Sequence, residues 1–193
     1  MVDIARPLYE DESLGLELKQ TVLAFDATVV DLCLSLFPWA EFRRTKGGLK
    51  IHTLLDLQSS IPVFIDITAA SIHEVNLLDQ LFLEPGTILI MDRGYLDFER
   101  LYKLNTKSVY FIIRAKKNFK YRRVYSHKTD KSRGVQCDQT IKLTGYKSQK
   151  KYPQCLRIIK YYDQKRDKKL LFLSNNFKLP AKTIADLTST AGR

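Results

Sequence analysis

No glutamate follows Glu99 in this chain of 193 residues, so every side-chain carboxylate in the second half must come from aspartate. The sequence also lacks a run of about 18 apolar residues, which excludes a membrane-spanning helix. Residues 1–20 are acidic and lack the basic and apolar segments of a signal peptide. We therefore expect a protein that works away from membranes.

Cysteine is scarce, and its spacing excludes two kinds of site. The chain has three cysteines, Cys33, Cys137 and Cys155, and no two of them have the CxxC spacing. Neither a disulfide framework nor a zinc site is indicated by such a pattern. A reducing, cytoplasmic setting fits best.

Charge is divided unevenly along the chain. Residues 1–99 carry 7 Lys and Arg against 16 Asp and Glu, a net charge of −9, whereas residues 100–193 carry 25 against 5, a net charge of +20; the two halves sum to +11. A basic half of this strength favours a polyanionic partner, above all nucleic acid. The alternative is a solvated basic face without a specific partner. A membrane surface is less favoured, because the basic residues run through strand-like segments rather than along an amphipathic helix.

Hydrophobic periodicity predicts a mixed α/β domain in the first 115 residues. The expected order is strands at 21–28, 49–57 and 63–68, a helix at 71–82, a strand at 87–91, a helix at 96–104 and a strand at 108–115. The first three strands are joined by short segments and should be antiparallel, while helices join the later ones. This order is that of a ribonuclease-H-like domain, one candidate among several α/β folds.

Three local predictions go with this order. Residues 29–39 are apolar but stop at Pro38, so a turn-rich excursion is expected there, and residues 41–48 should be a loop because they end in two glycines. The helix at 71–82 should begin with Ser71 as its N-cap and Glu74 three residues on.

Two aspartates each follow a run of four apolar residues. Asp26 ends the run from Val22, and Asp92 ends the run from Ile88, just before Gly94. Aspartates at the tips of strands in one sheet can hold divalent cations together, and such tips are a usual place for chemistry in α/β sheets. Alternatively, each aspartate begins a turn or caps a helix.

From residue 118 the pattern changes to short segments that alternate apolar and basic residues. They lie at 121–126, 135–143, 156–162 and 170–174, with polar turns such as 128–132 between them. We predict an antiparallel β-rich insertion. Its tyrosines alternate with Lys and Arg, so they could lie along a phosphate backbone or simply pack between strands. A helix should begin at Ala181.

Three motifs in their order resemble the bacterial insertion-sequence transposases of the DDE type, most closely the insertion-sequence-4 group. They are Phe25-Asp26-Ala27-Thr28, the segment from Thr45 to Asp56 that begins Thr-Lys-Gly-Gly, and Met91-Asp92-Arg93-Gly94-Tyr95. Residues 109–187, with Asn175-Asn176-Phe177, are also similar to that group's β insertion and to the start of its last catalytic helix. The resemblance covers nearly the whole chain up to Leu187.

The resemblance implies a ribonuclease-H-like core, with Asp26 and Asp92 as the first two acidic residues of its catalytic triad. It also implies two Mg²⁺ or Mn²⁺ ions that serve the cleavage of DNA and strand transfer by a DNA 3′-hydroxyl. Double-stranded DNA, both element ends and target, would be the partner. A homodimer and a cytoplasmic, nucleoid-associated location are expected on the same ground.

The sequence departs from the family pattern after Leu187. The family's helix continues with a Tyr, an Arg-Trp pair and the catalytic Glu, and none of these follows here. Asp186 lies about two helical turns too early to replace that Glu, and we expect it to cap a turn or a helix start. The interpretation is a truncated and inactive copy, whose missing Glu could be encoded in a downstream frame. The domains expected are 1–117 as the core, 118–178 as the insertion and 179–193 as the start of the final helix.

Several basic residues are candidates for DNA contact. They are Lys46, Lys50, His52, Arg93, Arg114, Lys116, Lys117, Arg122 and Arg123. The lysines near residue 50 could equally belong to a solvated loop, His52 could be a half-buried strand histidine, and Arg93 could pair with Asp92. Asp56 and Asp66 are expected in surface turns, and His73 and His127 on the surface.

Two further functions remain open at this point. One is a non-catalytic remnant that binds DNA without cutting it. The other is a stand-alone metal-dependent nuclease, which would need a third acidic ligand within residues 1–193.

Overall fold

The computed structural model describes residues 18, 20–33, 41–43, 46–115 and 119–191. They belong to two compact units, residues 1–82 and residues 83–193. Within these described ranges, no helix is long and apolar enough to cross a membrane. The predicted domain boundaries after residues 117 and 178 both fall inside the second unit, and they stay predictions.

The first unit is built on an antiparallel sheet. Its strands are β1 (Val22–Leu32), β2 (Glu41–Arg43), β3 (Lys46–Asp56) and β4 (Ile61–Ala69). β3 pairs with each of the other three, and its ladder with β1 runs from Leu23 opposite Asp56 to Leu32 opposite Gly47. The turn between β3 and β4 includes Ser60, which has a positive φ of 55°. The three antiparallel strands predicted for this region are therefore confirmed.

Two predictions for this unit are wrong at its strand ends. β1 continues to Leu32 and β3 begins at Lys46, so residues 29–32 pair with residues 47–50 and reach into segments where an excursion and a loop were predicted. Gly47 and Gly48 lie inside the ladder, opposite Leu32 and Asp31. The β-branched pair Val29-Val30 favours the extended backbone. Residues 34–40 lie outside the described part of the chain.

The helix predicted at 71–82 is replaced by a short 3₁₀ helix, η3 (Glu74–Asp79), whose N-cap is His73. Lys50 provides the physical reason. Its Nζ donates to the carbonyl of Ile72 at 2.9 Å and lies 3.2 Å from the Glu74 carboxylate. Glu74 is therefore engaged with β3, whereas a capping box needs it to reach back toward Ser71. Leu78 and Leu81 are buried, whereas Ile72 is 40% and Phe82 96% exposed, so only part of the predicted apolar face is formed.

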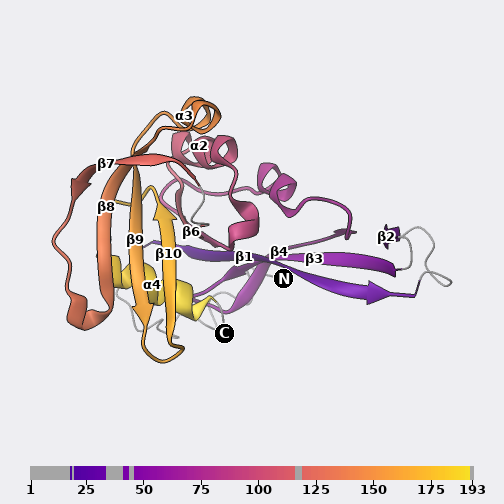
Figure 1. The fold of residues 1–193 in the computed structure, drawn as a ribbon. Helices are drawn as coiled ribbons and strands as arrows, with labels where there is room; N and C mark the ends of the chain where they lie inside the picture. The colour runs from indigo at the N-terminus through magenta and orange to yellow at the C-terminus, as the bar shows by residue number, and fades with distance from the viewer. Residues whose placement is uncertain (1–17, 19, 34–40, 44–45, 116–118, 192–193) are drawn as a thin grey trace. The chain divides into compact units, whose positions relative to one another are not determined.

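The second unit has a mixed sheet in the order β5-β6-β10-β9-β8-β7 (Figure 1). The strands are β5 (Ile88–Met91), β6 (Tyr110–Arg114), β7 (Tyr121–Ser126), β8 (Val135–Leu143), β9 (Leu156–Asp163) and β10 (Lys168–Ser174). β5 and β6 are parallel, and all other pairs in this order are antiparallel. The mixed α/β class is confirmed, and it is consistent with a ribonuclease-H-like domain.

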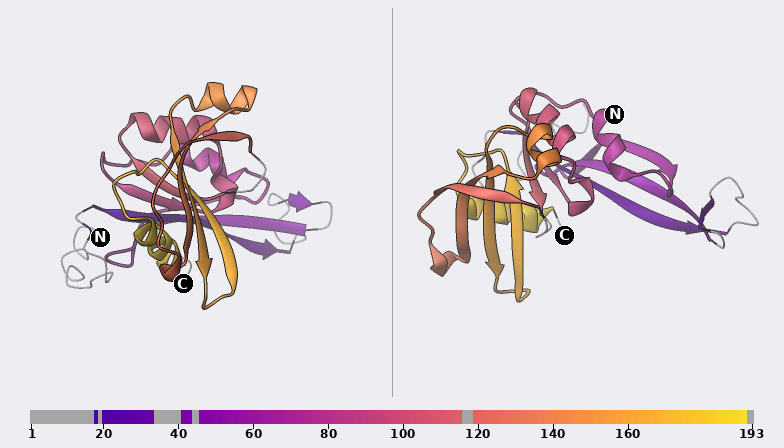
Figure 2. Two further views of the ribbon diagram at one scale, coloured as in Figure 1. Left: turned by 60° about the vertical axis from the view of Figure 1, so that its left-hand side comes forward. Right: turned by 45° about the horizontal axis from the view of Figure 1, so that its top comes forward.

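Helices flank this second sheet. The 3₁₀ turn η4 (Arg93–Tyr95) follows β5, and α2 (Phe98–Thr106) begins where Asp97 accepts the backbone N–H groups of Glu99 and Arg100. α3 (Tyr146–Lys151), which the sequence did not predict, lies beside α2 in both views of Figure 2. α4 (Ala181–Thr190) contacts β8. The turn η5 (Lys131–Arg133) connects β7 and β8.

Apolar side chains of β5, β6, β9 and β10 form the core of the second unit. Phe111, Ile112 and Ile113 of β6 are fully buried. Tyr152 is also fully buried and packs edge-on against Tyr102 and Phe111, with ring centroids 5.5 and 6.3 Å away. Burial raises the pKa of the Tyr152 hydroxyl well above its usual range. Of the two interpretations of the tyrosines, contact with a phosphate backbone and packing, Tyr152 therefore follows the second.

Candidate metal and nucleic-acid sites

Asp26 lies within β1 at the point where burial ends. The four residues before it, 22–25, are all buried, whereas Asp26 itself is exposed. Its backbone is opposite Thr53 of β3. The carboxylate accepts the N–H of the next residue, Ala27, at 2.8 Å. The strand continues for six residues beyond Asp26, so this carboxylate projects from an extended strand rather than from a turn.

Asp92 lies where β5 ends. The four strand residues before it are buried, and Asp92 is exposed in an extended backbone conformation with φ −80° and ψ 172°. It is the N-cap of η4, but its side chain makes no capping hydrogen bond, and only its carbonyl accepts the N–H of Tyr95, at 3.2 Å. Buried Tyr95, 1% exposed, fixes this turn. The carboxylate of Asp92 is thus not used in capping.

The two aspartates have the same local structure, although they belong to two different units. Each follows four buried residues on a strand, and each is exposed. Among the described residues, neither carboxylate is in an ion pair. Asp26 belongs to the first unit and Asp92 to the second. Their proximity, and their joint role in metal binding, therefore stay predictions.

The remaining acidic candidates are engaged elsewhere. Asp56 is 5% exposed and accepts the N–H of Gln58 at 3.0 Å, so it stabilises the β3–β4 turn from a buried position instead of the surface position expected. Asp66 lies within β4 and accepts the N–H of Ile67 at 2.9 Å. Asp186 pairs with Lys182 one turn earlier on α4, so its predicted capping role is wrong. Across the described ranges, no group of three His, Cys, Asp or Glu side chains could hold a metal ion.

Two predicted DNA contacts on β3 have structural partners instead. Lys50 is held by Ile72 and Glu74, and its side chain is 12% exposed. His52 is fully buried, contacts the ring of Phe25, and its Nε2 lies 2.9 Å from the Thr68 hydroxyl. Burial lowers the pKa of His52, so the neutral ring is favoured. These contacts weigh against a role in DNA binding for either residue.

The other predicted DNA contacts are on the surface or outside the described residues. Arg93, Arg114, Arg122 and Arg123 are exposed. The side chain of Lys46 and the whole of Lys116 and Lys117 lie outside the described part of the chain. His73 is exposed as predicted, and His127 is partly exposed with its Nε2 3.0 Å from the Thr140 hydroxyl.

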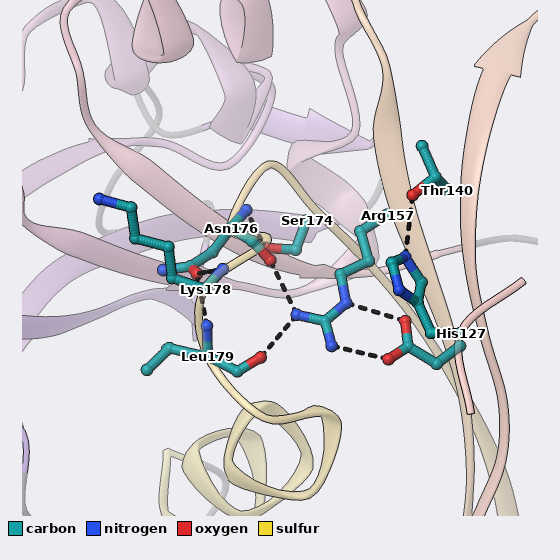
Figure 3. Close-up of polar contacts among 8 residues, drawn as sticks. His127, Thr140, Arg157, Ser174, Asn176, Lys178 and Leu179 are labelled. Atoms are coloured by element: carbon teal, nitrogen blue, oxygen red, sulfur yellow. Dashed lines mark hydrogen bonds and ion pairs between the residues drawn. The ribbon is translucent and has the colours of Figure 1, made fainter. Parts of the chain in front are cut away.

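A buried ion pair that the sequence gave no reason to expect links β8, β9 and the segment before α4 (Figure 3). Nε and Nη2 of Arg157 donate to the two oxygens of Asp138 at 2.8 and 2.7 Å, and the two side chains are 7% and 5% exposed. Nη1 donates to the carbonyls of Asn176 and Leu179, at 3.1 and 2.6 Å. One guanidinium therefore fixes the path of the chain into α4.

Residues 174–176 continue this polar network as the chain leaves β10. The Ser174 hydroxyl donates to the carbonyl of Phe111 at 2.6 Å. The side-chain oxygen of Asn175 accepts the N–H of Phe111, and its side-chain nitrogen donates to the carbonyl of Val109. The Asn176 side chain accepts the N–H groups of Lys178 and Leu179. The Asn-Asn pair noticed in the sequence is thus a structural anchor.

Comparisons with known proteins agree with this architecture. A family model described as a transposase DDE domain matches residues 17–190. A protein named as a probable transposase for insertion sequence element IS5377, from Geobacillus stearothermophilus, is 26% identical over 166 residues, which cover 84% of this chain and 42% of that protein. The protein y4zB of Sinorhizobium fredii, also named as a transposase, is 28% identical over 166 residues, 84% of this chain and 46% of that protein.

This chain spans less than half the length of those two curated relatives. The family match, in contrast, covers most of the chain and includes both Asp26 and Asp92. The resemblance that the sequence motifs indicated is confirmed at the level of the family. This chain belongs to the transposase DDE domain family.

Proposed function

We propose that Asp26 and Asp92 of this chain are metal ligands for the DNA-cleavage and strand-transfer chemistry of insertion-sequence transposition; the interpretation of the chain as an inactive copy is tested by the nicking assay below. The observation that carries the proposal is the pair of exposed aspartates, each following four buried strand residues, inside a matched DDE domain. Rigid strands and exposed carboxylates suit a site that must meet a large substrate.

The donor atoms fit the cations that the family uses. Both side chains offer hard carboxylate oxygens, which Mg²⁺ and Mn²⁺ prefer, and no cation within the described residues competes for them. When bound, a pair of such ions stabilises the charge on the attacking and leaving oxygens of a phosphodiester. Asp26 and Asp92 would hold the ions in place, because each is fixed by a buried strand on its N-terminal side.

DNA would be bound by the second unit. Residues 100–193 carry a net charge of +20, and the exposed side chains of Arg93, Arg114, Arg122 and Arg123 can reach phosphates. A homodimer and a cytoplasmic, nucleoid-associated location follow from the family resemblance and belong to the same proposal.

A nicking assay on supercoiled DNA tests this function. The chain is incubated with Mg²⁺ or Mn²⁺, and the variants Asp26→Asn and Asp92→Asn are compared with matched controls. Asp31→Asn removes a charge from an exposed position on the same strand as Asp26, and Glu84→Gln removes one from the second unit. If the unmodified chain nicks DNA, both site variants should reduce nicking to the level without protein and both controls should keep it; no nicking by the unmodified chain would agree with an inactive copy.

The assay also separates the alternatives. DNA binding that falls with salt, without metal-dependent nicking by the unmodified chain, supports the non-catalytic remnant. Nicking that survives both Asp26→Asn and Asp92→Asn contradicts the proposed site. No observation favours the stand-alone nuclease, because no third acidic ligand is grouped with either aspartate among the residues described.

A further inference from the structure

The strand register brings two basic loops to one end of the second sheet. The first, residues 128–133, lies between β7 and β8, and the second, residues 164–169, is the turn after β9 together with the first two residues of β10. Val135 at the start of β8 is opposite Tyr161 near the end of β9, and Lys168 at the start of β10 is opposite Asp163. Figure 1 shows both loops at the lower end of these strands, with α3 at the upper end. We call the two loops the loop-end surface.

A close contact holds the end of the β7–β8 connection against β9. Gly134, which directly follows the first loop, has a positive φ of 82°, and its carbonyl accepts the N–H of Tyr162 at 2.8 Å. A Cβ at this position would lie 2.7 Å from the carbonyl oxygen of Tyr162 and 2.8 Å from the ring of Tyr161. Only glycine permits both this backbone conformation and this approach. The relative position of the two loops is therefore fixed by β8 and β9.

Cations dominate the loop-end surface. All seven are exposed: Lys128, Lys131, Arg133, Lys165, Arg166, Lys168 and Lys169. Arg133 and Arg166 lie 3.5 and 4.0 Å from local aspartates. Among the described residues, the five lysines are in no ion pair. Their charges are thus available to an external partner.

The three aspartates of this region stabilise the loops. Asp130 accepts the N–H and the hydroxyl of Ser132, and this hydrogen bonding lowers the pKa of Asp130. Asp163 is 9% exposed and accepts the N–H groups of residues 165 and 166. Asp167, with a positive φ of 48°, accepts the Tyr162 hydroxyl at 2.6 Å. The loops are therefore ordered by acidic side chains, while the basic ones face solvent.

We infer that the loop-end surface is a docking surface for the phosphate backbone of double-stranded DNA, distinct from the predicted arginine contacts on β7. Lysine is a compact point charge suited to phosphate, and no large apolar side chain is exposed in either loop, as a protein partner would favour. The inference rests on the proposed function only in taking DNA as the partner. The acidic half of a second copy, net −9 over residues 1–99, is the competing occupant.

The test compares two triple variants of the full chain in binding to a labelled DNA duplex over a range of salt, without divalent metal. Lys165→Gln/Lys168→Gln/Lys169→Gln removes three charges from the loop-end surface. Lys147→Gln/Lys150→Gln/Lys151→Gln removes three exposed charges from α3, at the opposite end of the same sheet. Both variants keep the same net charge as each other, and thermal unfolding checks that both fold.

For the loop-end triple, we expect the slope of log affinity against log salt to become less steep by about 2–3, since each phosphate contact contributes about 0.9. The α3 triple should leave the slope within about 0.5 of the original. Equal losses from both triples would overturn the inference in favour of diffuse attraction. If the loop-end triple changes self-association in sedimentation but leaves DNA binding unchanged, the inference is wrong and the surface binds a second copy of the chain.

Failure of the inference and failure of the proposed function have different signatures. Because the assay contains no metal and leaves Asp26 and Asp92 unchanged, its result does not depend on cleavage. If the unmodified chain binds DNA and the loop-end triple binds equally well, only the docking surface is contradicted. If the unmodified chain binds no DNA, both are contradicted.

Discussion

The two units of this chain fix their polar groups by different means. In the first unit, Asp26 lies in the middle of a long backbone ladder, where β1 and β3 pair from Leu23 to Leu32. In the second unit, the chain leaves short strands through side-chain hydrogen bonds, of which the Arg157–Asp138 pair and the 174–176 anchor are the main ones. A backbone ladder depends on a residue pattern, whereas a side-chain network depends on particular residues. The second unit should therefore be more sensitive to single polar substitutions.

The largest expected effect tests that sensitivity at Arg157. Arg157→Met leaves the Asp138 carboxylate buried without its partner, and should lower the free energy of unfolding by about 3–5 kcal/mol. Urea denaturation measures the loss. The matched control is Arg122→Met at an exposed position of β7, which should change the free energy by less than about 0.5 kcal/mol.

A double variant sharpens the same comparison. Arg157→Met/Asp138→Leu removes both charges, so no unpaired carboxylate remains, and it should recover a large part of the stability lost in Arg157→Met alone. If the double variant is as unstable as the single one, the cost lies in the lost bonds to Asn176 and Leu179 rather than in a buried charge.

The next effect lies along β1, where burial changes within one strand. Phe25 is 1% exposed and Val30 is 39% exposed. Phe25→Ala should lower the free energy of unfolding by about 3 kcal/mol through the cavity it leaves, whereas Val30→Ala should cost less than about 0.5 kcal/mol. Equal costs would mean that the second half of β1 is as well packed as the first.

A smaller effect concerns the buried histidine of the first unit. Burial holds the pKa of His52 below its ordinary value of 6.5, and its Nδ1 is buried without a hydrogen-bond partner. The folded state binds a proton at His52 more weakly than the unfolded state does. The free energy of unfolding is therefore not reduced by this group above pH 6.5, and it decreases as the pH falls below 6.5. The loss cannot exceed about 1.4 kcal/mol per pH unit.

Denaturation at pH 7 and pH 5 measures this contribution. His52→Gln should remove most of the difference in unfolding free energy between the two values, and His73→Gln, at an exposed position, should keep it. A difference unchanged by His52→Gln would show that other groups are responsible.

Sequence patterns predicted most of the strands and failed where a tertiary contact decided the outcome. The bounds of β7 and β8 match the predicted 121–126 and 135–143, because apolar and basic residues alternate there between clear turn signals. The helix predicted at 71–82 failed because Lys50, more than twenty residues earlier, engages Glu74 and Ile72. No periodicity in the sequence reports such a contact.

The candidate site was predictable in its parts. A run of four apolar residues predicted a buried strand segment before Asp26 and before Asp92, and both aspartates are exposed, but only Asp92 lies at the strand tip that was predicted. The pattern did not show that β1 continues past residue 28 to Leu32, because the apolar pair Val29-Val30 fits a turn-rich segment equally well. The Arg157–Asp138 pair was not predictable, since a charged residue in an alternating strand is normally assigned to the solvent side.

The most direct test of the account is Mn²⁺ binding, measured by electron paramagnetic resonance on the unmodified chain, on Asp26→Asn, on Asp92→Asn and on the double variant. If the two carboxylates share one site, each single variant should weaken binding by about tenfold or more, and the double variant should be little worse than either single one. Binding that is unchanged by both substitutions, or losses that simply add as for two independent sites, would contradict it.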